Sequence, residues 1–412
     1  MLSKSKWIGF VIIVSWGWLS CDTESTVNPY YQKYFIKYYG EDGDQEAVDL
    51  VANPDGSIII VGNTRLSVSS NTMFVVKTDA EGNVEWQRRL GVNNESAKDV
   101  EPILAGPDAG NFVVLSDVRR PLVDSVDIRL TIISPAGDSL RSVLYTQYES
   151  KFGKSVTNTP DGGYLVSGLV LRADTTNVEL PGLIDRNDVL HVKFSSTLSV
   201  IYTDRIGGSS LGSGIRSFES LTSRFQAEYT DELDVNTPGD LVYESNFVFR
   251  NLDLSTNIQK TFYAGNPNLN EEMAGISTSP SGNFLAVGTQ FTTSGSKRLY
   301  AALVINNFNL VQDQRVIGPD NLEGVNVCSA GGSKFIVVGN KIGPGGRNIW
   351  VARVDTGLNV EFEIQFGGST NNDRASAVTE LPSGDILVLG TMDLSNQDKI
   401  ALIKLKANGQ FE

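Results

Sequence analysis

Residues 47–91 read AVDLVANPDGSIIIVGNTRLSVSSNTMFVVKTDAEGNVEWQRRLG. Four short runs of β-branched or aromatic residues alternate here with residues typical of turns, which predicts four strands. The turn at Pro54-Asp55-Gly56 and the turn at residues 80–83 both contain glycine. Glycine supplies the positive φ that a tight hairpin turn demands. This stretch is therefore expected to form one four-stranded antiparallel unit.

The same unit returns about every fifty residues along the chain, which is the sequence signature of a repeat architecture. Copies of its second strand lie at residues 163–168, 283–288, 334–339 and 385–390, with a weaker copy at 111–116. The ends of successive units are marked by Gly40, Gly91, Thr146, Gly207, Gly265, Gly318 and Gly367. Seven marks at this spacing predict seven units.

The two ends of the chain predict how the units close on each other. The last unit stops at residues 409–412, where its fourth strand should begin, while residues 33–40 form a spare strand that aligns with residues 84–91. The N-terminal strand should therefore complete the last unit, as in a closed β-propeller. We expect an all-β, seven-bladed β-propeller of four-stranded antiparallel blades. A linear β-solenoid is the alternative, but it does not explain a missing strand at one end and a spare strand at the other.

The repeat resembles that of bacterial secreted β-propellers, including the quinoprotein-like repeat in which a strand is followed by Asp, a Gly turn and Trp, here Asp79, Gly82 and Trp86. The Trp position is occupied in other units by Phe35, Tyr202, Phe362, Arg141 and Asp313. The aromatic side chains at this position are expected to pack between blades. The resemblance covers nearly all of residues 33–412 and implies a fold, with no activity attached to it. Nothing matches the site of the quinone-dependent dehydrogenases, so no cofactor is carried over.

The N-terminus is typical of a bacterial lipoprotein signal. Lys4 and Lys6 precede the fourteen-residue apolar run 7–20, which is too short to span a bilayer, and Cys21 follows at once. Residues 18–21 resemble a lipobox, in which a small residue precedes the cysteine that is lipidated. We expect residues 1–20 to be removed, residues 21–32 to be a lipidated cysteine and a short tether, and residues 33–412 to be a single β-propeller domain. An ordinary secretory signal cleaved near Ser20 is the alternative.

This signal predicts an address in the bacterial cell envelope, with outer-membrane anchoring favoured and the side of the membrane left open. The chain has 34 Lys and Arg against 48 Asp and Glu, a net charge of -14. Such a charge disfavours nucleic acid and anionic lipid surfaces as partners. The expected partners are the membrane, through the lipid anchor, and a protein or glycan ligand.

The loops of a β-propeller lie on two faces. The short turns inside the hairpins, such as Pro54-Asp55-Gly56, share one face, which we call the hairpin face. The loops between second and third strands and the connections between blades share the opposite face, which we call the long-loop face. Length and composition vary on the long-loop face, where the longest insertion runs from Arg172 to Asn187, so this face is the expected binding surface.

A carboxylate recurs eight or nine residues before the first hairpin turn of several units. The five members are Glu46, Asp99, Glu272, Glu323 and Asp373. At the start of the innermost strands these side chains are expected to ring one mouth of the central channel and to bind a cation or a polyhydroxylated ligand. The alternative is that each caps backbone N–H groups where the chain enters its blade.

A calcium site is a weaker candidate. Asp42, Asp44 and Glu46 have the alternate spacing that a calcium loop uses, but the run lacks the rest of a twelve-residue EF-hand pattern. A solvated acidic loop explains the same residues.

Other catalytic constellations have little support in the composition. The sequence has one histidine, His191, which lies within an expected third strand, and Cys328 lies within an expected first strand as a small buried hydrophobe. Residues 207–214 are rich in glycine but lack the Gly-Lys-Ser/Thr ending of a phosphate-binding loop. The leading hypothesis is a non-catalytic binding or assembly module acting through the long-loop face. The alternative is a carbohydrate-active enzyme, a glycoside hydrolase or lyase, that uses two carboxylates at the channel mouth.

Overall fold

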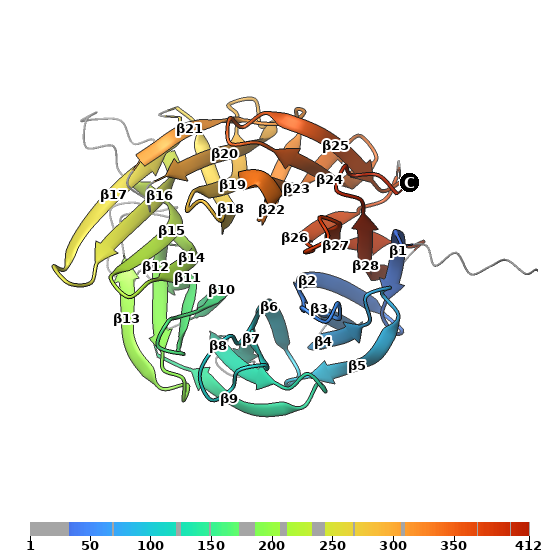
Figure 1. The fold of residues 1–412 in the computed structure, drawn as a ribbon, viewed down its shortest axis with the longest axis horizontal. Coiled ribbons are helices and arrows are strands. Elements are labelled where there is room, and N and C mark those ends of the chain that lie inside the picture. The colour runs from blue at the N-terminus through green and yellow to red at the C-terminus, as the bar shows by residue number, and fades with distance from the viewer. Residues whose placement is uncertain are drawn as a thin grey trace, which may run out of the picture. The chain divides into compact units, whose positions relative to one another are not determined.

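The computed structural model describes residues 33–411 apart from residues 68–69, 121–124, 148–149, 173–185, 207–211, 233–243, 267, 306–309, 369 and 396. Residues 34–412 form one compact unit. Its strands form seven four-stranded antiparallel sheets, which follow one another in chain order around a central axis (Figure 1). The prediction of a seven-bladed β-propeller is confirmed. Among the described residues, no helix is both long and apolar enough to cross a membrane.

In the first six blades the strands follow chain order from the axis outward. Blade 1 contains β2 (Asp44–Ala52), β3 (Ile58–Ser67), β4 (Ser70–Thr78) and β5 (Val84–Leu90). Blade 2 contains β6 (Glu95–Pro102), β7 (Phe112–Arg120), β8 (Ser125–Ile133) and β9 (Ser139–Tyr145). Blade 3 contains β10 (Lys151–Asn158), β11 (Tyr164–Arg172), β12 (Arg186–Phe194) and β13 (Val200–Ile206). Blade 4 contains β14 (Gly212–Glu219), β15 (Ser223–Glu232), β16 (Glu244–Asp253) and β17 (Ile258–Ala264).

Three blades complete the ring. Blade 5 contains β18 (Asn270–Thr278), β19 (Phe284–Phe291), β20 (Lys297–Ile305) and β21 (Leu310–Val316). Blade 6 contains β22 (Leu322–Ala330), the 3-10 turn η1 (Gly331–Ser333), β23 (Lys334–Gly343), β24 (Gly346–Val354) and β25 (Val360–Phe366). Blade 7 contains β26 (Arg374–Glu380), β27 (Ile386–Asp393), β28 (Asp398–Leu405) and, from the other end of the chain, β1 (Phe35–Tyr39).

The N-terminal strand closes the ring as predicted. β1 pairs antiparallel with β28, in a register that runs from Phe35 opposite Lys404 to Tyr39 opposite Ile400. Phe35 and Tyr39 are buried in a cluster that also contains Ile60 of blade 1. The closing strand therefore supplies apolar surface to the blade 7–blade 1 interface as well as backbone hydrogen bonds.

Where the repeat carries an aromatic residue at this position, the ring packs one blade on the next. A Cβ atom on Gly137, in the β8–β9 turn of blade 2, would lie 2.9 Å from the ring of Trp86 in blade 1, whose indole N–H donates to the carbonyl oxygen of Pro135 at 3.2 Å. Phe35 lies in the same way against Gly82. The prediction of aromatic packing between blades is confirmed, and the turn glycines leave room for the rings.

The glycine that follows the second strand's apolar run has a steric reason. A Cβ atom on Gly288 of β19 would lie 2.0 Å from the carbonyl oxygen of Glu272 on β18, and the equivalent glycines of four other blades show the same conflict at 2.1–2.6 Å. Each of these carbonyl groups lies beside a β-bulge in the innermost strand. The bulge needs the close approach that only glycine allows.

The residue after this glycine bonds to the next blade. The Ala97 N–H donates to Asn63 Oδ1 at 2.7 Å, and the Ala375 N–H donates to Asn340 Oδ1 at 2.8 Å. In each pair the donor belongs to the innermost strand of the following blade. Together with apolar clusters that cross from blade to blade, these bonds fix the angle at which neighbouring blades meet.

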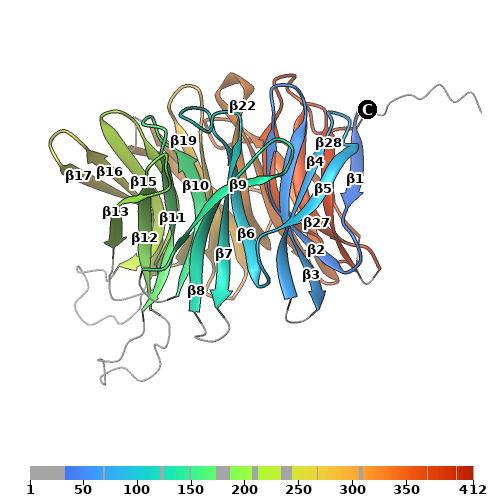
Figure 2. The same cartoon turned by 90° about the horizontal axis from the view of Figure 1, so that it is seen from below.

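The two faces are distinct in a side view (Figure 2). The innermost strands run from the long-loop face to the hairpin face, so the first residues of β2, β6 and β10 lie at the long-loop end. Most of the Arg172–Asn187 insertion lies outside the described residues.

A methyl group added at Gly288 tests how closely the second strand must approach the innermost strand. We expect Gly288→Ala to lower the free energy of unfolding by about 1–3 kcal/mol, because the methyl group meets a backbone carbonyl that cannot rotate away. Gly343→Ala is the matched control, since a Cβ atom there has its nearest neighbour at 3.8 Å. Urea unfolding followed by circular dichroism measures both. Equal stability of the two variants would contradict the steric explanation.

Candidate functional site

The five recurring acids do not occupy one position in the ring. Glu46, Glu272 and Glu323 each stand two residues before the bulge of their innermost strand. Asp99 comes directly after the bulge of β6, three residues further into the channel, and Asp373 precedes β26 by one residue. The expected ring of five equivalent carboxylates is therefore wrong in its geometry. The count runs back from the hairpin turn, and the turn between β6 and β7 (residues 103–111) is longer than the turn between β2 and β3 (residues 53–57), while Asp373 stands nine residues before Pro382 and not eight.

Two of the five acids hold backbone groups in the way the capping alternative describes. Asp373 accepts hydrogen bonds from the Gly368 N–H at 3.1 Å and the Asp393 N–H at 2.9 Å. Asp99 accepts a hydrogen bond from the Val156 N–H of blade 3 at 2.7 Å. Each carboxylate thus secures a chain segment beside its innermost strand.

Sequence reasoning missed the acids that share the position of Asp373. Glu95 is buried at the start of β6 and accepts hydrogen bonds from the Val92 N–H, the Ser116 hydroxyl and the Arg129 guanidinium at 2.6–2.8 Å. Glu271, also buried, lies at this position in blade 5. The sequence prediction chose Glu272 instead, because Glu271 and Glu272 are neighbouring acids and the count from the turn ends on Glu272.

The three remaining acids differ from one another. Glu323 accepts a hydrogen bond from Lys297 Nζ at 2.6 Å. Burial raises the pKa of Glu272, and the Lys297 and Lys154 ammonium groups oppose that shift. Glu46 lines a small cavity of about 100 Å³ at the junction of blades 7 and 1.

The weak calcium candidates lie at that same junction. Asp44 accepts a hydrogen bond from the Asp398 N–H at 3.2 Å, and Asp42 lies in the loop before β2. Within the described part of the chain, no group of three or more His, Cys, Asp or Glu side chains is arranged to hold a metal ion.

A second pair of acids lies inside the central channel. Asp49 and Asp99 follow the bulges of β2 and β6, and both line a cavity of about 160 Å³. Burial raises the pKa of Asp49 well above its ordinary value, and the charge of Asp99 and a hydrogen bond with it act in the same direction. Asp49 also accepts a hydrogen bond from the Val100 N–H at 3.2 Å. Burial and the neighbouring carboxyl group therefore favour the protonated form of Asp49.

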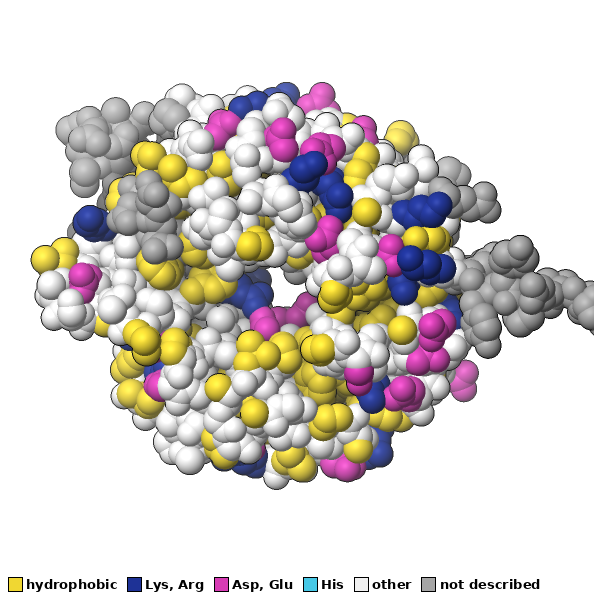
Figure 3. All heavy atoms as spheres, in the orientation of Figure 1, with side chains coloured by type: hydrophobic (Ala, Val, Ile, Leu, Met, Phe, Trp, Pro, Cys, Tyr) yellow, Lys and Arg dark blue, Asp and Glu magenta, His cyan; other side chains and the backbone are white. Residues whose placement is uncertain are grey.

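Cationic side chains line the same channel on one side. Lys98, Lys154 and Arg216 come from β6, β10 and β14, whereas the facing positions on β18, β22 and β26 include Ala274, Val325 and Ser376. Figure 3, which looks onto the hairpin face, shows Lys or Arg and Asp or Glu side chains at the lower left of the central opening. Within this cavity the cationic side chains come from blades 2–4, and the lining side chains of blades 5–7 are uncharged.

A larger cavity opens at the long-loop face between blades 2 and 3. Its volume is about 350 Å³, within the range of roughly 300–1,000 Å³ that is usual for ligand pockets. It is lined by Asn94, Ser96, Lys98, Asp117, Arg119, Val126, Ser150, Phe152 and Leu171. We call it the blade 2–3 pocket. Lys98 lines both this pocket and the channel cavity, so the two are neighbours.

Backbone hydrogen bonds shape the walls of the blade 2–3 pocket. The Arg119 N–H donates to the Asn94 carbonyl at 2.9 Å, and the Leu171 N–H donates to the Ser150 carbonyl at 2.8 Å. These equivalent bonds tie each blade connection to the end of a second strand. The rigid frame presents amide, hydroxyl and charged groups beside the partly buried ring of Phe152.

One ion pair crosses the floor of this pocket. Lys98 Nζ lies 3.3 Å from Asp117 Oδ2, and Asp117 Oδ1 accepts a hydrogen bond from the Gly153 N–H at 2.8 Å. Burial raises the pKa of Asp117, while Lys98 acts to lower it. Lys154 occupies the same bulge position in blade 3 as Lys98 in blade 2. A lysine where other blades carry Val48 or Ala274 was a signal in the sequence that could have marked this site.

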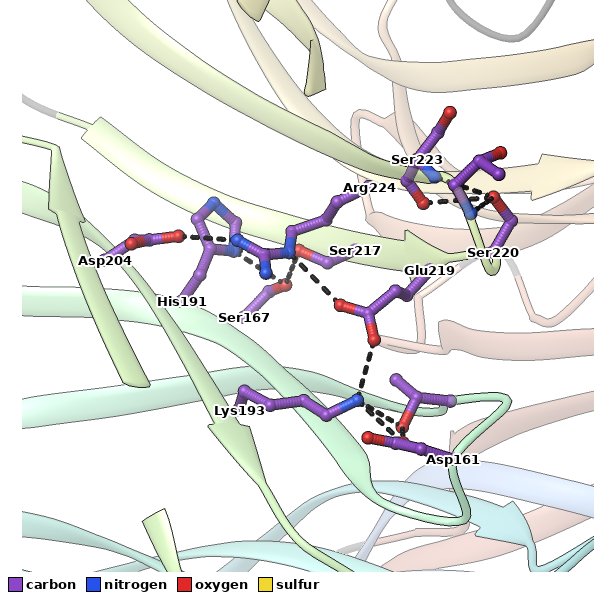
Figure 4. A network of polar contacts seen from close by, with 12 residues as sticks. Asp161, Ser167, His191, Lys193, Asp204, Ser217, Glu219, Ser220, Ser223 and Arg224 are labelled. Carbon is purple, nitrogen blue, oxygen red and sulfur yellow. Dashed lines mark hydrogen bonds and ion pairs between the residues drawn. The ribbon is translucent and has the colours of Figure 1, made fainter. Parts of the chain in front are cut away.

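His191 belongs to a buried contact between blades 3 and 4 (Figure 4). Its Nδ1 lies 2.9 Å from Ser217 Oγ and 3.1 Å from Ser167 Oγ, and its Nε2 lies 3.4 Å from Glu228 Oε2. The order Ser, His, Glu is that of a catalytic triad, but all four side chains are fully buried, so a substrate does not reach them. The arrangement joins β11 and β12 to β14 and β15.

Two further sequence features have plain structural outcomes. Burial raises the pKa of Cys328 to about 12, which opposes formation of a reactive thiolate. Residues 207–211 of the glycine-rich run 207–214 lie outside the described residues, and its last three residues begin β14.

Comparison with known proteins gives the fold and no closer relationship. No protein-family model matches the sequence, and no curated protein matches it. The solved structures that resemble this chain include polysaccharide lyase Uly1, with a TM-score of 0.55, 8% identity and coverage of 90% of this chain and 91% of that chain. The extracellular region of plexin A4 matches with a TM-score of 0.53, 9% identity and coverage of 90% of this chain and 51% of that chain.

A third similar structure is the β-propeller domain of the Trilobed protease from Pyrococcus furiosus. Its TM-score is 0.51 at 10% identity, and the match covers 88% of this chain and 95% of that chain. That domain has an open velcro topology, whereas β1 pairs with β28 in this chain. Likenesses at such low identity establish the fold alone, because β-propellers carry unrelated functions.

The Asp49 carboxyl group should make stability depend on pH. Because folding raises its pKa, the folded chain holds this proton more tightly, and stability falls as the pH rises from 3.8 through the raised value. We expect Asp49→Asn to gain melting temperature relative to wild type over that range, since the amide remains neutral. Asp55→Asn is a control of opposite sign, because hydrogen bonds from Ser57 lower the pKa of Asp55. A constant difference between Asp49→Asn and wild type from pH 4 to pH 8 would contradict the assignment.

Proposed function

We propose that this protein is a lipid-anchored, non-catalytic binding module of the bacterial outer membrane that takes a glycan in the blade 2–3 pocket. The observation that carries the proposal is the pocket itself. It is large enough for a sugar ring, opens on the long-loop face and combines amide and hydroxyl groups with an aromatic ring. A sugar ligand uses polar groups and an aromatic ring together, because its hydroxyl groups require hydrogen-bond partners while its C–H faces pack on aromatic surfaces.

The anchor rests on the sequence alone. A basic and apolar segment precedes Cys21, and residues 18–21 resemble a lipobox. These residues lie outside the described part of the structure. With a net charge of -14 the chain has little electrostatic attraction to anionic lipid, so the acyl chains would provide the attachment.

A carbohydrate-active enzyme is the second candidate, and one observation favours it. Asp49, with its raised pKa, lies beside Asp99 in the channel, and a protonated carboxyl group is what a general acid requires. Two features place this candidate second. Both acids already accept backbone hydrogen bonds, and the cavity beside them is only about 160 Å³.

Replacing the lipobox cysteine tests the anchor. We expect the wild-type protein to sediment with membranes and to carry a lipid-sized mass increase on its N-terminal peptide. Cys21→Ser should instead appear in the soluble fraction, because no thiol remains for lipid attachment. Cys328→Ser is the matched control and should behave as wild type. Membrane association of Cys21→Ser after a carbonate wash would contradict the proposal.

Glycan-array screening of the mature chain carrying Cys21→Ser tests the pocket. We expect a defined set of oligosaccharides to bind, and Phe152→Ala to weaken that binding by roughly tenfold, because the ring covers an apolar sugar face. Tyr38→Ala removes an exposed aromatic ring on β1 and should leave affinity unchanged. Release of reducing ends from a bound glycan, abolished by Asp49→Ala, would instead support the enzyme.

A further inference from the structure

We infer that the ligand of the blade 2–3 pocket is an acidic glycan, whose carboxylate or sulfate group is held by Lys98 and Lys154 where the pocket meets the channel. This inference rests on the proposed function and specifies its ligand class.

The first support is the position of the two lysines. Both are the bulge residues of adjacent innermost strands, β6 and β10, and both line the channel cavity, while Lys98 also lines the blade 2–3 pocket. An anionic group at the end of a ligand in this pocket would therefore meet two ammonium groups.

The second support is that the fold does not need lysine at this position. The bulge residues of the other blades are Val48, Ile215, Ala274, Val325 and Ser376. A residue required for closing the ring would recur in most blades, as the glycine of the second strand does in five of them. The two charged residues break the repeat in neighbouring blades at the edge of one pocket, which is the expected pattern for a binding site.

The third support is the state of Lys154. It makes no hydrogen bond or ion pair with any residue that the structure describes, and its exposed side chain lines the channel cavity, where a ligand can reach it. Its pKa is lowered by desolvation and by the Lys98 ammonium, whereas the Asp117 and Glu272 carboxylates oppose the shift. An anion bound between the two lysines would give Lys154 a charged partner.

The acids nearby do not remove this attraction. Asp117 is nearly buried and uses one oxygen for the Gly153 N–H, while the other faces Lys98. Asp117 therefore fixes the position of Lys98 and forms no ion pair with Lys154. Glu101 pairs with Arg216 further along the channel.

The test compares acidic oligosaccharides with neutral forms of the same sugars. The probes are tetramers of galacturonate, glucuronate and mannuronate, their methyl esters, and a sulfated galactose tetramer, each titrated calorimetrically into the mature chain carrying Cys21→Ser. We expect at least one acid to bind at least about tenfold more tightly than its ester, with affinity falling as salt increases. The uronates and the sulfated sugar together show which anionic group is preferred.

Lys154→Met should remove about tenfold or more of the affinity for the acid while reducing the affinity for the ester far less, and Lys98→Met should weaken acid binding as well. Lys260→Met on β17 is the control, because it makes the same change in net charge at an exposed site on blade 4. Lys154→Met is expected to keep the wild-type melting temperature. As a second measurement on the unaltered lysine, the bound acid should protect Lys154, and not Lys260, from acetylation detected by mass spectrometry.

The outcomes separate the two proposals. Equal affinity for acid and ester, with Phe152→Ala still weakening both, would overturn the acidic ligand and leave the glycan module standing. Acid binding that Lys154→Met leaves unchanged, without protection of Lys154, would also overturn the inference. A complete absence of glycan binding would overturn both.

Discussion

Each blade of this protein packs both of its faces against neighbouring blades, and an open ring would leave two such faces in water. The pairing of β1 with β28 avoids the free-energy cost of exposing those apolar faces. The strand that completes blade 7 also brings Phe35 and Tyr39 into the cluster shared with blade 1. The remaining regularities follow from this contact between blades. Aromatic rings lie on turn glycines, and Asn63 and Asn340, each directly after the glycine of a second strand, bond to the next innermost strand.

Departures from the repeat gather in blades 2–4. The interface between blades 2 and 3 contains the buried pair Lys151–Asp127 at 2.5 Å, and the next interface contains the His191 network. Pairs of this kind add little net stability, because burial removes the hydration of both charges, but losing one partner is costly. Polar contacts therefore constrain how these blades meet, in addition to an apolar cluster that blades 2 and 3 share much as blades 5 and 6 do.

The same sector holds the candidate site, and the physical connection is the channel. Innermost strands converge on the axis, so one residue from each blade is enough to alter the chemistry of the wall. Lys98 and Lys154 do so on one side, and the blade 2–3 pocket opens beside them. A scaffold whose stability is spread over seven similar interfaces can tolerate such local charge at one of them.

The sequence by itself determined the architecture, because strand periodicity and turn glycines recur along the chain and the spare N-terminal strand matches a strand missing at the other end. It also indicated that acidic side chains lie at the start of innermost strands, where the chain enters a blade, as Asp373 and Glu95 do. Only the tertiary structure decided which acids are equivalent, since hairpin turns of unequal length shift the count and bulges change which side chain faces the axis. It likewise decided the pocket, whose walls come from residues 94–171 of two blades. The proximity of Lys98, Asp117 and Phe152 depends on the angle between those blades, and no spacing along the chain encodes that angle.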